Sequence, residues 1–156
     1  MKVLLAVDGS ECSDLAVEEV STRPWPKGTE VKLLAVATSR FPEWYLDSSL
    51  ALIAAHDLEV RDHCEKLAAL LPKIAEKIQN TYNGNALKID AEVVEGYPKE
   101  AIVEEAERWG ADLIVLGSHG YGNLKRLFLG SVAQSVVAHA PCSVEVVRQK
   151  KILENA

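Results

Sequence analysis

Short apolar runs alternate along the chain with stretches in which apolar residues recur every three or four positions. The apolar runs have the length and composition of buried strands, and the intervening stretches have the period of amphipathic helices. This alternation predicts the α/β class: a single doubly wound, five-stranded parallel sheet with helices on both faces and right-handed crossovers. The predicted strands lie at residues 2–8, 31–38, 87–96, 112–117 and 143–148.

The segments between the predicted strands allow three further predictions. Ser10 or Ser13 is expected to cap a helix over about residues 12–20. Pro72 interrupts the apolar stripe of a long helix and is expected to kink or split it. Residues 39–55 carry Phe41, Trp44 and Tyr45 and are predicted to be an irregular connection or lid, whose aromatic rings either pack locally or close over a ligand.

Length and composition narrow the class of protein. The 156 residues fit one domain, predicted over residues 1–149, followed by a C-terminal tail over residues 150–156. A net charge of −6 argues against nucleic acid as a partner, because such binding depends on neutralising phosphates. The apolar runs are too short to span a membrane, and the first is too short for a signal peptide, which predicts a cytoplasmic protein. Three cysteines without paired spacing give no disulfide framework or zinc site.

Candidate chemistry falls where the predicted strands end. Asp8 follows the first strand, Val36 lies near the end of the second, and Gly117 ends the fourth. Ligands of doubly wound sheets bind beyond the carboxyl ends of the strands, where the strand order reverses. If the first and fourth strands are neighbours, Asp8 and Gly117 share one crevice.

A glycine-rich stretch, "GSHGYGNLKRLFLGSVAQSVV", begins at that point. Gly117, Gly120 and Gly130-Ser131 have the spacing Gly-x2-Gly-x9-Gly-Ser, without the Gly-Lys-Ser/Thr of a Walker A loop. Successive amides in such a loop, together with the start of the next helix, favour a polyphosphate. The alternative is a loop that only turns the chain, and the spacing alone does not decide between the two. His119 within the loop is expected to face solvent.

The stretch resembles the signature of the universal stress protein family, and the resemblance covers essentially the whole chain. It implies a Rossmann-like, adenine nucleotide alpha hydrolase-like fold and, in the ATP-binding branch, ATP with Mg²⁺ as ligands. Asp8 would lie beside the nucleotide and its metal, and Val36 along the adenine; the alternatives are a turn cap and a core residue. Ala133 departs from the pattern, because some ATP-binding relatives carry a hydroxyl there. The implied nucleotide-binding residues are Asp8, Val36, Leu116, Gly117, Gly120, Gly130, Ser131 and Val132, with Asp8 also at the metal.

The resemblance therefore implies an ATP-binding module of the stress response or of signalling. It also implies a homodimer that pairs through the last strand, at residues 143–148. No catalytic residue is identified, so ATP hydrolysis would be slow at most. A nucleotide-free dimeric interaction protein is the main alternative, and an enzyme of phosphoryl or adenylyl transfer is a weaker one.

Overall fold

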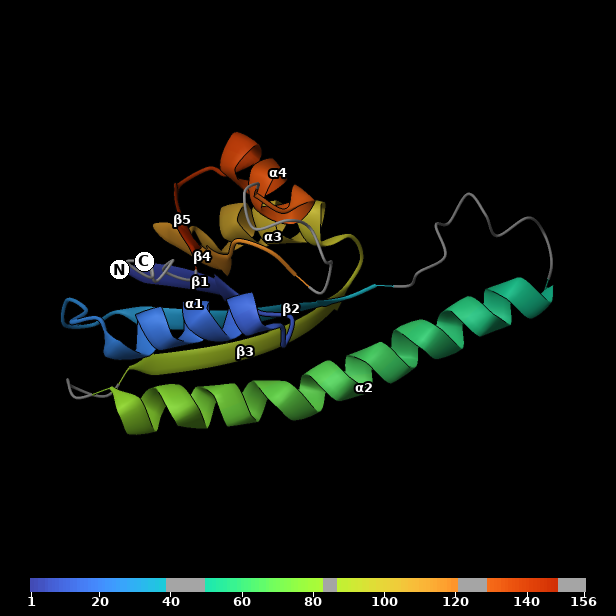
Figure 1. Cartoon of the computed structure of the whole chain (residues 1–156), viewed down its shortest axis with the longest axis horizontal. Coiled ribbons are helices and arrows are strands. Elements are labelled where there is room, and N and C mark those ends of the chain that lie inside the picture. Colours follow the sequence, from blue (N-terminus) through green and yellow to red (C-terminus); the bar gives the residue numbers. More distant parts are fainter. Residues whose placement is uncertain (39–49, 83–86, 121–128, 149–156) are drawn as a thin grey trace, which may run out of the picture.

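The computed structural model describes residues 1–38, 50–82, 87–120 and 129–148, in which five strands and four helices alternate (Figure 1). All neighbouring strands are parallel, in the order β3-β2-β1-β4-β5, so the predicted fold class is confirmed. In chain order the elements are β1 (Lys2–Ala6), α1 (Glu11–Thr22), β2 (Glu30–Ala37), α2 (Leu50–Thr81), β3 (Lys88–Glu95), α3 (Pro98–Trp109), β4 (Leu113–Gly117), α4 (Ser131–His139) and β5 (Ser143–Val147).

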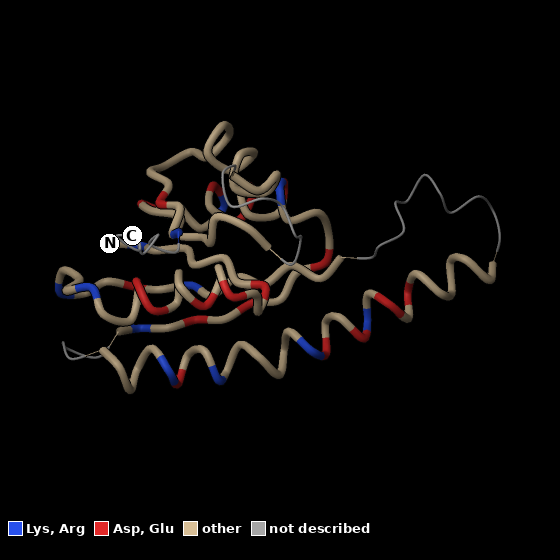
Figure 2. Tube along the Cα trace, in the orientation of Figure 1, with Lys and Arg blue, Asp and Glu red and all other residues tan. Residues whose placement is uncertain are grey.

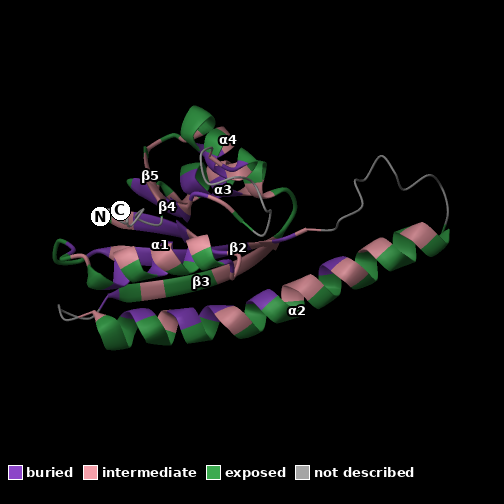
Figure 3. Ribbon diagram, viewed as in Figure 1, coloured by how far each residue is buried: buried purple, intermediate pink, exposed green. Residues whose placement is uncertain are grey.

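The helices cover both faces of the sheet, with α1 and α2 on one face and α3 and α4 on the other (Figure 1). Each strand contributes to two cores because successive side chains point to opposite faces. In β1, Val3 and Leu5 join the core under α1 and α2, whereas Leu4 joins the core under α3 and α4. Figure 3 shows the buried positions concentrated in the sheet between these layers. The strand order reverses between β1 and β4, which places the expected ligand crevice at their carboxyl ends.

The long helix α2 corrects two predictions. It is continuous from Leu50 to Thr81 and includes Pro72, so the proline does not split the helix as it could have done, and a kink at Pro72 stays a prediction. Pro72 is exposed, and the carbonyl that it leaves without an amide partner, that of Ala68, belongs to an exposed residue as well. Residues 50–55, predicted to be irregular, form the first turns of α2 because leucine and alanine favour a helix. The other predicted lid residues, 39–49, lie outside the described part of the chain, as does the predicted tail at 150–156.

One ion-paired cluster crosses the α3 face of the sheet. Lys32 of β2 is only 5% exposed, and its Nζ lies 2.6 Å from Oε1 of the buried Glu105 and 2.9 Å from Oε2 of Glu92. Arg108 Nε donates to Glu105 at 2.7 Å, and Lys32 lies over the ring of Trp109. Burial opposes the charge of Lys32, but the two carboxylates outweigh it, so the pKa of Lys32 is raised above its ordinary value. The cluster joins β2, β3 and α3.

None of the helices in the described ranges is both long and apolar enough to cross a membrane.

Candidate functional site

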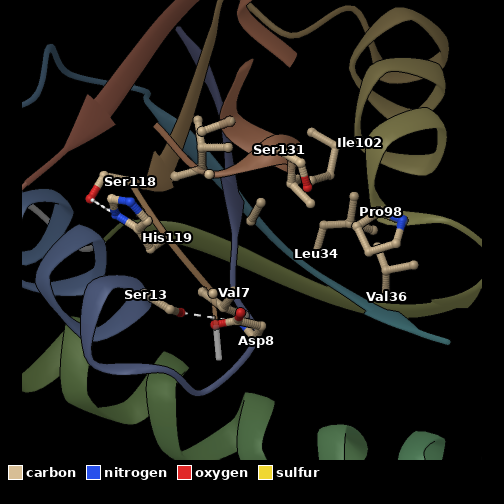
Figure 4. A pocket seen from close by; sticks show the side chains of 17 residues that line it. Val7, Asp8, Ser13, Leu34, Val36, Pro98, Ile102, Ser118, His119 and Ser131 are labelled. Carbon is tan, nitrogen blue, oxygen red and sulfur yellow. Dashed lines mark hydrogen bonds between the residues drawn. The ribbon is translucent and has the colours of Figure 1, made fainter. Parts of the chain in front are cut away.

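A cavity of about 260 Å³ opens at the carboxyl ends of β1 and β4, on the α3 and α4 side of the sheet (Figure 4). The pairing of β1 with β4 brings the two strand ends together as expected. All eight residues predicted to bind a nucleotide line this cavity. Their role toward a nucleotide stays a prediction. The eight residues are Asp8, Val36, Leu116, Gly117, Gly120, Gly130, Ser131 and Val132.

Asp8 begins the turn between β1 and α1 and has a structural role. Its Oδ1 accepts a hydrogen bond from the amide of Ser10 at 2.9 Å, and its own amide donates to Ser13 Oγ at 3.2 Å. Ser10 is the N-cap of α1, with its Oγ accepting from the amide of Ser13. One carboxylate oxygen of Asp8 is thus used in the turn. Its Oδ2 lies on the side of Gly120, where a Cβ would come within 2.8 Å of it.

The glycines of the loop allow parts of the chain itself to approach closely. A Cβ on Gly117 would lie 2.5 Å from the carbonyl carbon of Cys12, at the start of α1. A Cβ on Gly130 would lie 3.1 Å from the carbonyl oxygen of Ser118, which also accepts a hydrogen bond from the Gly130 amide at 2.8 Å. Gly117 is therefore required by packing whether or not a ligand binds, and a side chain at Gly130 would need its neighbours to move by a few tenths of an ångström. The loop-only alternative explains their presence but not the cavity beside them.

The N-terminus of α4 is open toward the cavity. Gly130 is its N-cap and offers no side chain, and the first helical hydrogen bond runs from the Gln134 amide to the Gly130 carbonyl. The amides of Ser131, Val132 and Ala133 precede that bond, and no side chain among the described residues caps them. The N-terminus of α1, by contrast, is capped by Ser10. These amides and the helix dipole make the start of α4 suitable for an anion.

The backbone amide and carbonyl of Val36 are directed toward the same cavity. Residues of a strand between two parallel neighbours direct their amide and carbonyl alternately to one neighbour and the other. The Leu34 carbonyl accepts from the Val7 amide, and the Ala37 carbonyl accepts from the Gly96 amide on the β3 side. The amide and carbonyl of Val36 therefore face the β1 side. The paired part of β1 ends at Ala6, opposite Leu34, so no residue of that strand lies opposite Val36.

Sequence reasoning missed the apolar wall of the cavity. Leu34, Pro98 and Ile102 line it, and Figure 4 shows them with Val36 on one side of the cavity. Asp8, Ser13, Ser118 and His119 lie on the other side. The sequence did contain a signal for this wall. Because α3 follows a parallel strand, its first turn must start at the edge of the sheet where the strands end and the cavity lies. Pro98 and Ile102, four residues apart, share one side of that helix start.

His119 does not face solvent as expected. Its Nδ1 lies 3.0 Å from Ser118 Oγ, and its Nε2 is buried without a hydrogen-bond partner in the described part of the chain. A buried polar atom without a partner costs on the order of 1–3 kcal/mol. The ring lies beside Gly130, where a Cβ would be 3.9 Å from its Cδ2. His119 is thus packed into the loop and is not a solvated side chain.

The described residues of this cavity provide one carboxylate as a ligand for a metal ion. Among the described residues, no three His, Cys, Asp or Glu side chains are grouped so that they could hold a metal. Asp8 is the one acidic residue in the described part of the chain that lines the cavity. Mg²⁺ is commonly held by one or two carboxylates, with phosphates and water completing its six ligands. Asp8 therefore fits Mg²⁺ that arrives with a phosphate ligand, and does not fit a metal site built from protein groups alone.

Comparison with known proteins identifies relatives over nearly the full chain. The universal stress protein MJ0577 of Methanocaldococcus jannaschii is 33% identical over 96% of this chain and 95% of its own. The solved structure of MJ0577 matches with a TM-score of 0.78 at 30% identity, covering 96% of each chain.

Two more distant structures share the fold and contain nucleotides. A universal stress protein in complex with cAMP matches with a TM-score of 0.67 at 23% identity, covering 96% of this chain and 98% of its own. An Arabidopsis thaliana family member with AMP bound matches with a TM-score of 0.60 at 20% identity, covering 97% of this chain and 93% of its own. The family model for universal stress proteins matches residues 1–148. The chain therefore belongs to the universal stress protein family.

Proposed function

We propose that this protein binds ATP, together with Mg²⁺, and acts as a module of the stress response or of signalling. The observation that carries the proposal is the cavity that combines an uncapped helix N-terminus with an unpaired strand end. Relatives of the same fold in complex with cAMP and with AMP support an adenine nucleotide as the ligand class.

The adenine would lie against the apolar wall. Leu34, Val36, Pro98 and Ile102 provide an apolar surface for its ring. The amide and carbonyl of Val36 provide one donor and one acceptor at the end of β2. The edge of adenine carries a ring-nitrogen acceptor beside an amino donor, which complements that pair. Guanine presents a different order of donors and acceptors on its edge, so the same arrangement favours adenine.

The phosphates would lie at the start of α4. The amides of Ser131 and its neighbours are free to donate, and the Ser131 hydroxyl is exposed beside them. The residues that line the described cavity include no lysine or arginine. Of the groups that the structure describes, backbone amides, the helix dipole and a metal ion at Asp8 would therefore balance the phosphate charge. Ala133 is buried at the cavity wall, and its amide remains even though it lacks a hydroxyl.

Hydrolysis of ATP would be slow at most. Among the residues that line the cavity, Asp8 and His119 are the ones that could act as a base. One oxygen of Asp8 is engaged in the turn, and the free nitrogen of His119 is buried. General base catalysis requires a group within hydrogen-bond reach of the attacking water. A binding module is therefore favoured over an enzyme.

Blocking the adenine position tests the binding proposal. We expect Val36→Trp to weaken ATP binding at least tenfold, because the larger ring would occupy the apolar wall. Val137→Trp is the matched control, since Val137 is 51% exposed on α4 and does not line the cavity. Calorimetric titration with ATP and Mg²⁺ measures both variants beside the wild type. Absence of ATP binding by the wild type would contradict the proposal, and equal binding by both variants would place the site elsewhere.

We also propose that the protein forms a homodimer through β5. The two edge strands of the sheet differ in charge. The β3 edge carries the exposed side chains of Lys88, Asp90 and Glu95, which discourage pairing with another strand. In β5 the one charged residue, Glu145, is neutralised by Arg23, whose two terminal nitrogens donate to it at 2.8 and 2.6 Å. The β5 edge is therefore the one suited to pairing with a second copy.

A proline on the outer side of β5 tests the dimer. The Ser118 amide donates to the Val147 carbonyl, so by alternation the amide of Val146 points away from β4. We expect Val146→Pro to produce a monomer, because it removes that outward donor without breaking the β4–β5 ladder. Val93→Pro, at an outward position of β3, is the control and should leave the dimer intact. Sedimentation velocity decides, and a wild-type monomer or a dimeric Val146→Pro would refute the proposal.

A further inference from the structure

A second hollow lies on the other side of Asp8, between the β1–α1 turn and α2. It has a volume of about 470 Å³. Asp8 lines both this groove and the main cavity, so the two meet at the switch point of the sheet. Asp8 and Gly9 form the turn side of the groove. The α2 side consists of His63, Lys66, Leu67, Ala69, Leu70 and Lys73.

The groove is cationic in a protein of net negative charge. Lys66 and Lys73 are seven residues apart, two helical turns, so they stand on the same side of α2. Figure 2 shows acidic and basic positions mixed along this helix. Among its described ionisable residues, only Lys66, Lys73 and His63 line the groove. Among the residues that the structure describes, Asp8 is the single acidic one that lines it.

The two lysines have charge available for a ligand. Lys66 Nζ lies 2.6 Å from Oδ2 of Asp62, but both side chains are more than 60% exposed, and such pairs hold each other weakly. Lys73 has no ion-pair partner among the residues that the structure describes. Between the lysines, Ala69 and Leu70 offer a small apolar floor. His63 is held by Thr38, whose amide lies 3.2 Å and whose carbonyl oxygen lies 3.1 Å from its Nδ1. This contact fixes α2 against the end of β2.

We propose that this groove, defined by Gly9, Lys66, Leu70 and Lys73, receives an additional phosphate group of the ligand bound in the main cavity. The inference rests on the proposed nucleotide function and narrows its ligand class. The ligand is an adenine nucleotide whose anionic groups extend past those of ATP and cross Asp8 toward α2. A cation at Asp8 offsets the repulsion between this carboxylate and the crossing phosphate. Gly9, in the left-handed region at φ 80°, has no side chain to stand in the path.

The additional phosphate has two chemical sources, and the experiment separates them. Adenosine 3′,5′-bisphosphate carries it on the ribose, and P1,P4-di(adenosine-5′) tetraphosphate carries it along an extended chain. Calorimetric titrations in the presence of Mg²⁺ compare each of these with AMP and ATP, respectively. We expect the wild type to bind one of the two extended ligands at least tenfold more tightly than its shorter counterpart. The extended ligand that binds more tightly than its shorter counterpart shows whether the additional phosphate is attached to the ribose or to the phosphate chain.

Variants that remove the lysine charges test whether the tighter binding of the extended ligand depends on the groove. In Lys66→Gln/Lys73→Gln the tenfold advantage should disappear, while binding of ATP stays within twofold of the wild type. Lys27→Gln/Lys77→Gln removes the same charge outside the groove and should retain the advantage. The inference is overturned if neither extended ligand gains in the wild type, or if the gain survives in Lys66→Gln/Lys73→Gln. A wild type that binds ATP without further gain refutes this inference alone, whereas a wild type that binds none of the four refutes the proposed function as well.

Discussion

We expect Glu105→Gln to lower the free energy of unfolding by about 3 kcal/mol, because breaking a buried ion pair leaves its partner's charge uncompensated. Lys32 and Glu105 are each 5% exposed. With the carboxylate of Glu105 removed, Lys32 keeps only Glu92, whose side chain is 37% exposed. Urea denaturation of both proteins at neutral pH measures the loss.

The control lies one position away on the same helix. Glu104 is exposed on α3, and Glu104→Gln should change the free energy of unfolding by less than about 0.5 kcal/mol. If both variants unfold at the same urea concentration as the wild type, the cluster does not hold α3 to the sheet.

The same cluster predicts a dependence on alkaline pH. The pKa of Lys32 is raised in the folded state, so its contribution to stability is complete below the unfolded pKa of about 10.4. That contribution is lost as pH rises through the folded pKa. Above about pH 10, stability of the wild type should therefore fall more steeply than that of Glu105→Gln. Parallel curves would show that Lys32 does not gain its proton affinity from Glu105.

Gly117→Ala is expected to destabilise the fold by about 3 kcal/mol, the upper end for inserting an atom into a packed region. The added Cβ would lie 2.5 Å from the carbonyl carbon and 2.6 Å from the carbonyl oxygen of Cys12. Both atoms belong to the backbone of α1, so no side-chain rotation relieves the contact. The melting temperature and the urea midpoint should both fall.

Gly120→Ala provides the contrast within the same loop. Among the described residues, its added Cβ would meet only the carboxylate of Asp8, with Oδ2 at 2.8 Å and Cγ at 4.0 Å, and this carboxylate can rotate away. We expect less than about 1 kcal/mol of lost stability but weaker Mg²⁺-dependent binding of ATP, because Asp8 is displaced. Equal stability losses in the two alanine variants would show that the loop does not pack against α1 as described.

The fold and the position of the site could be predicted from the sequence because both follow from short-range patterns. Continuous apolar runs identify buried parallel strands, and the residues at their carboxyl ends, such as Asp8 and Gly117, therefore lie at the same edge of the sheet. A motif's spacing adds Gly130 and Ser131 at a helix start. The pairing of β1 with β4, which the sequence left open, is what brings Asp8 and Gly117 together.

The remaining features depend on contacts between distant segments. Lys32 is visible in the sequence as a charge inside an apolar run, but its partner Glu105 lies 73 residues further on. The packing of Gly117 against Cys12 joins β4 to α1. The split expected at Pro72 is absent for another reason, since helix propensity takes no account of whether the side of the helix that carries the proline faces water. Tertiary context decides all three.

The central place of β1 has a consequence for folding during synthesis. Its first neighbour, β2, follows soon in the chain, but its second, β4, starts at Leu113, roughly 75 residues after β2 ends. At a synthesis rate of about 5–20 residues per second, one edge of the apolar strand β1 stays unpaired for on the order of 4–15 s, until β4 has been synthesised. An unpaired strand edge is prone to aggregation for as long as it is exposed. Nascent chains stalled before β4 are therefore the form of this protein most in need of a chaperone.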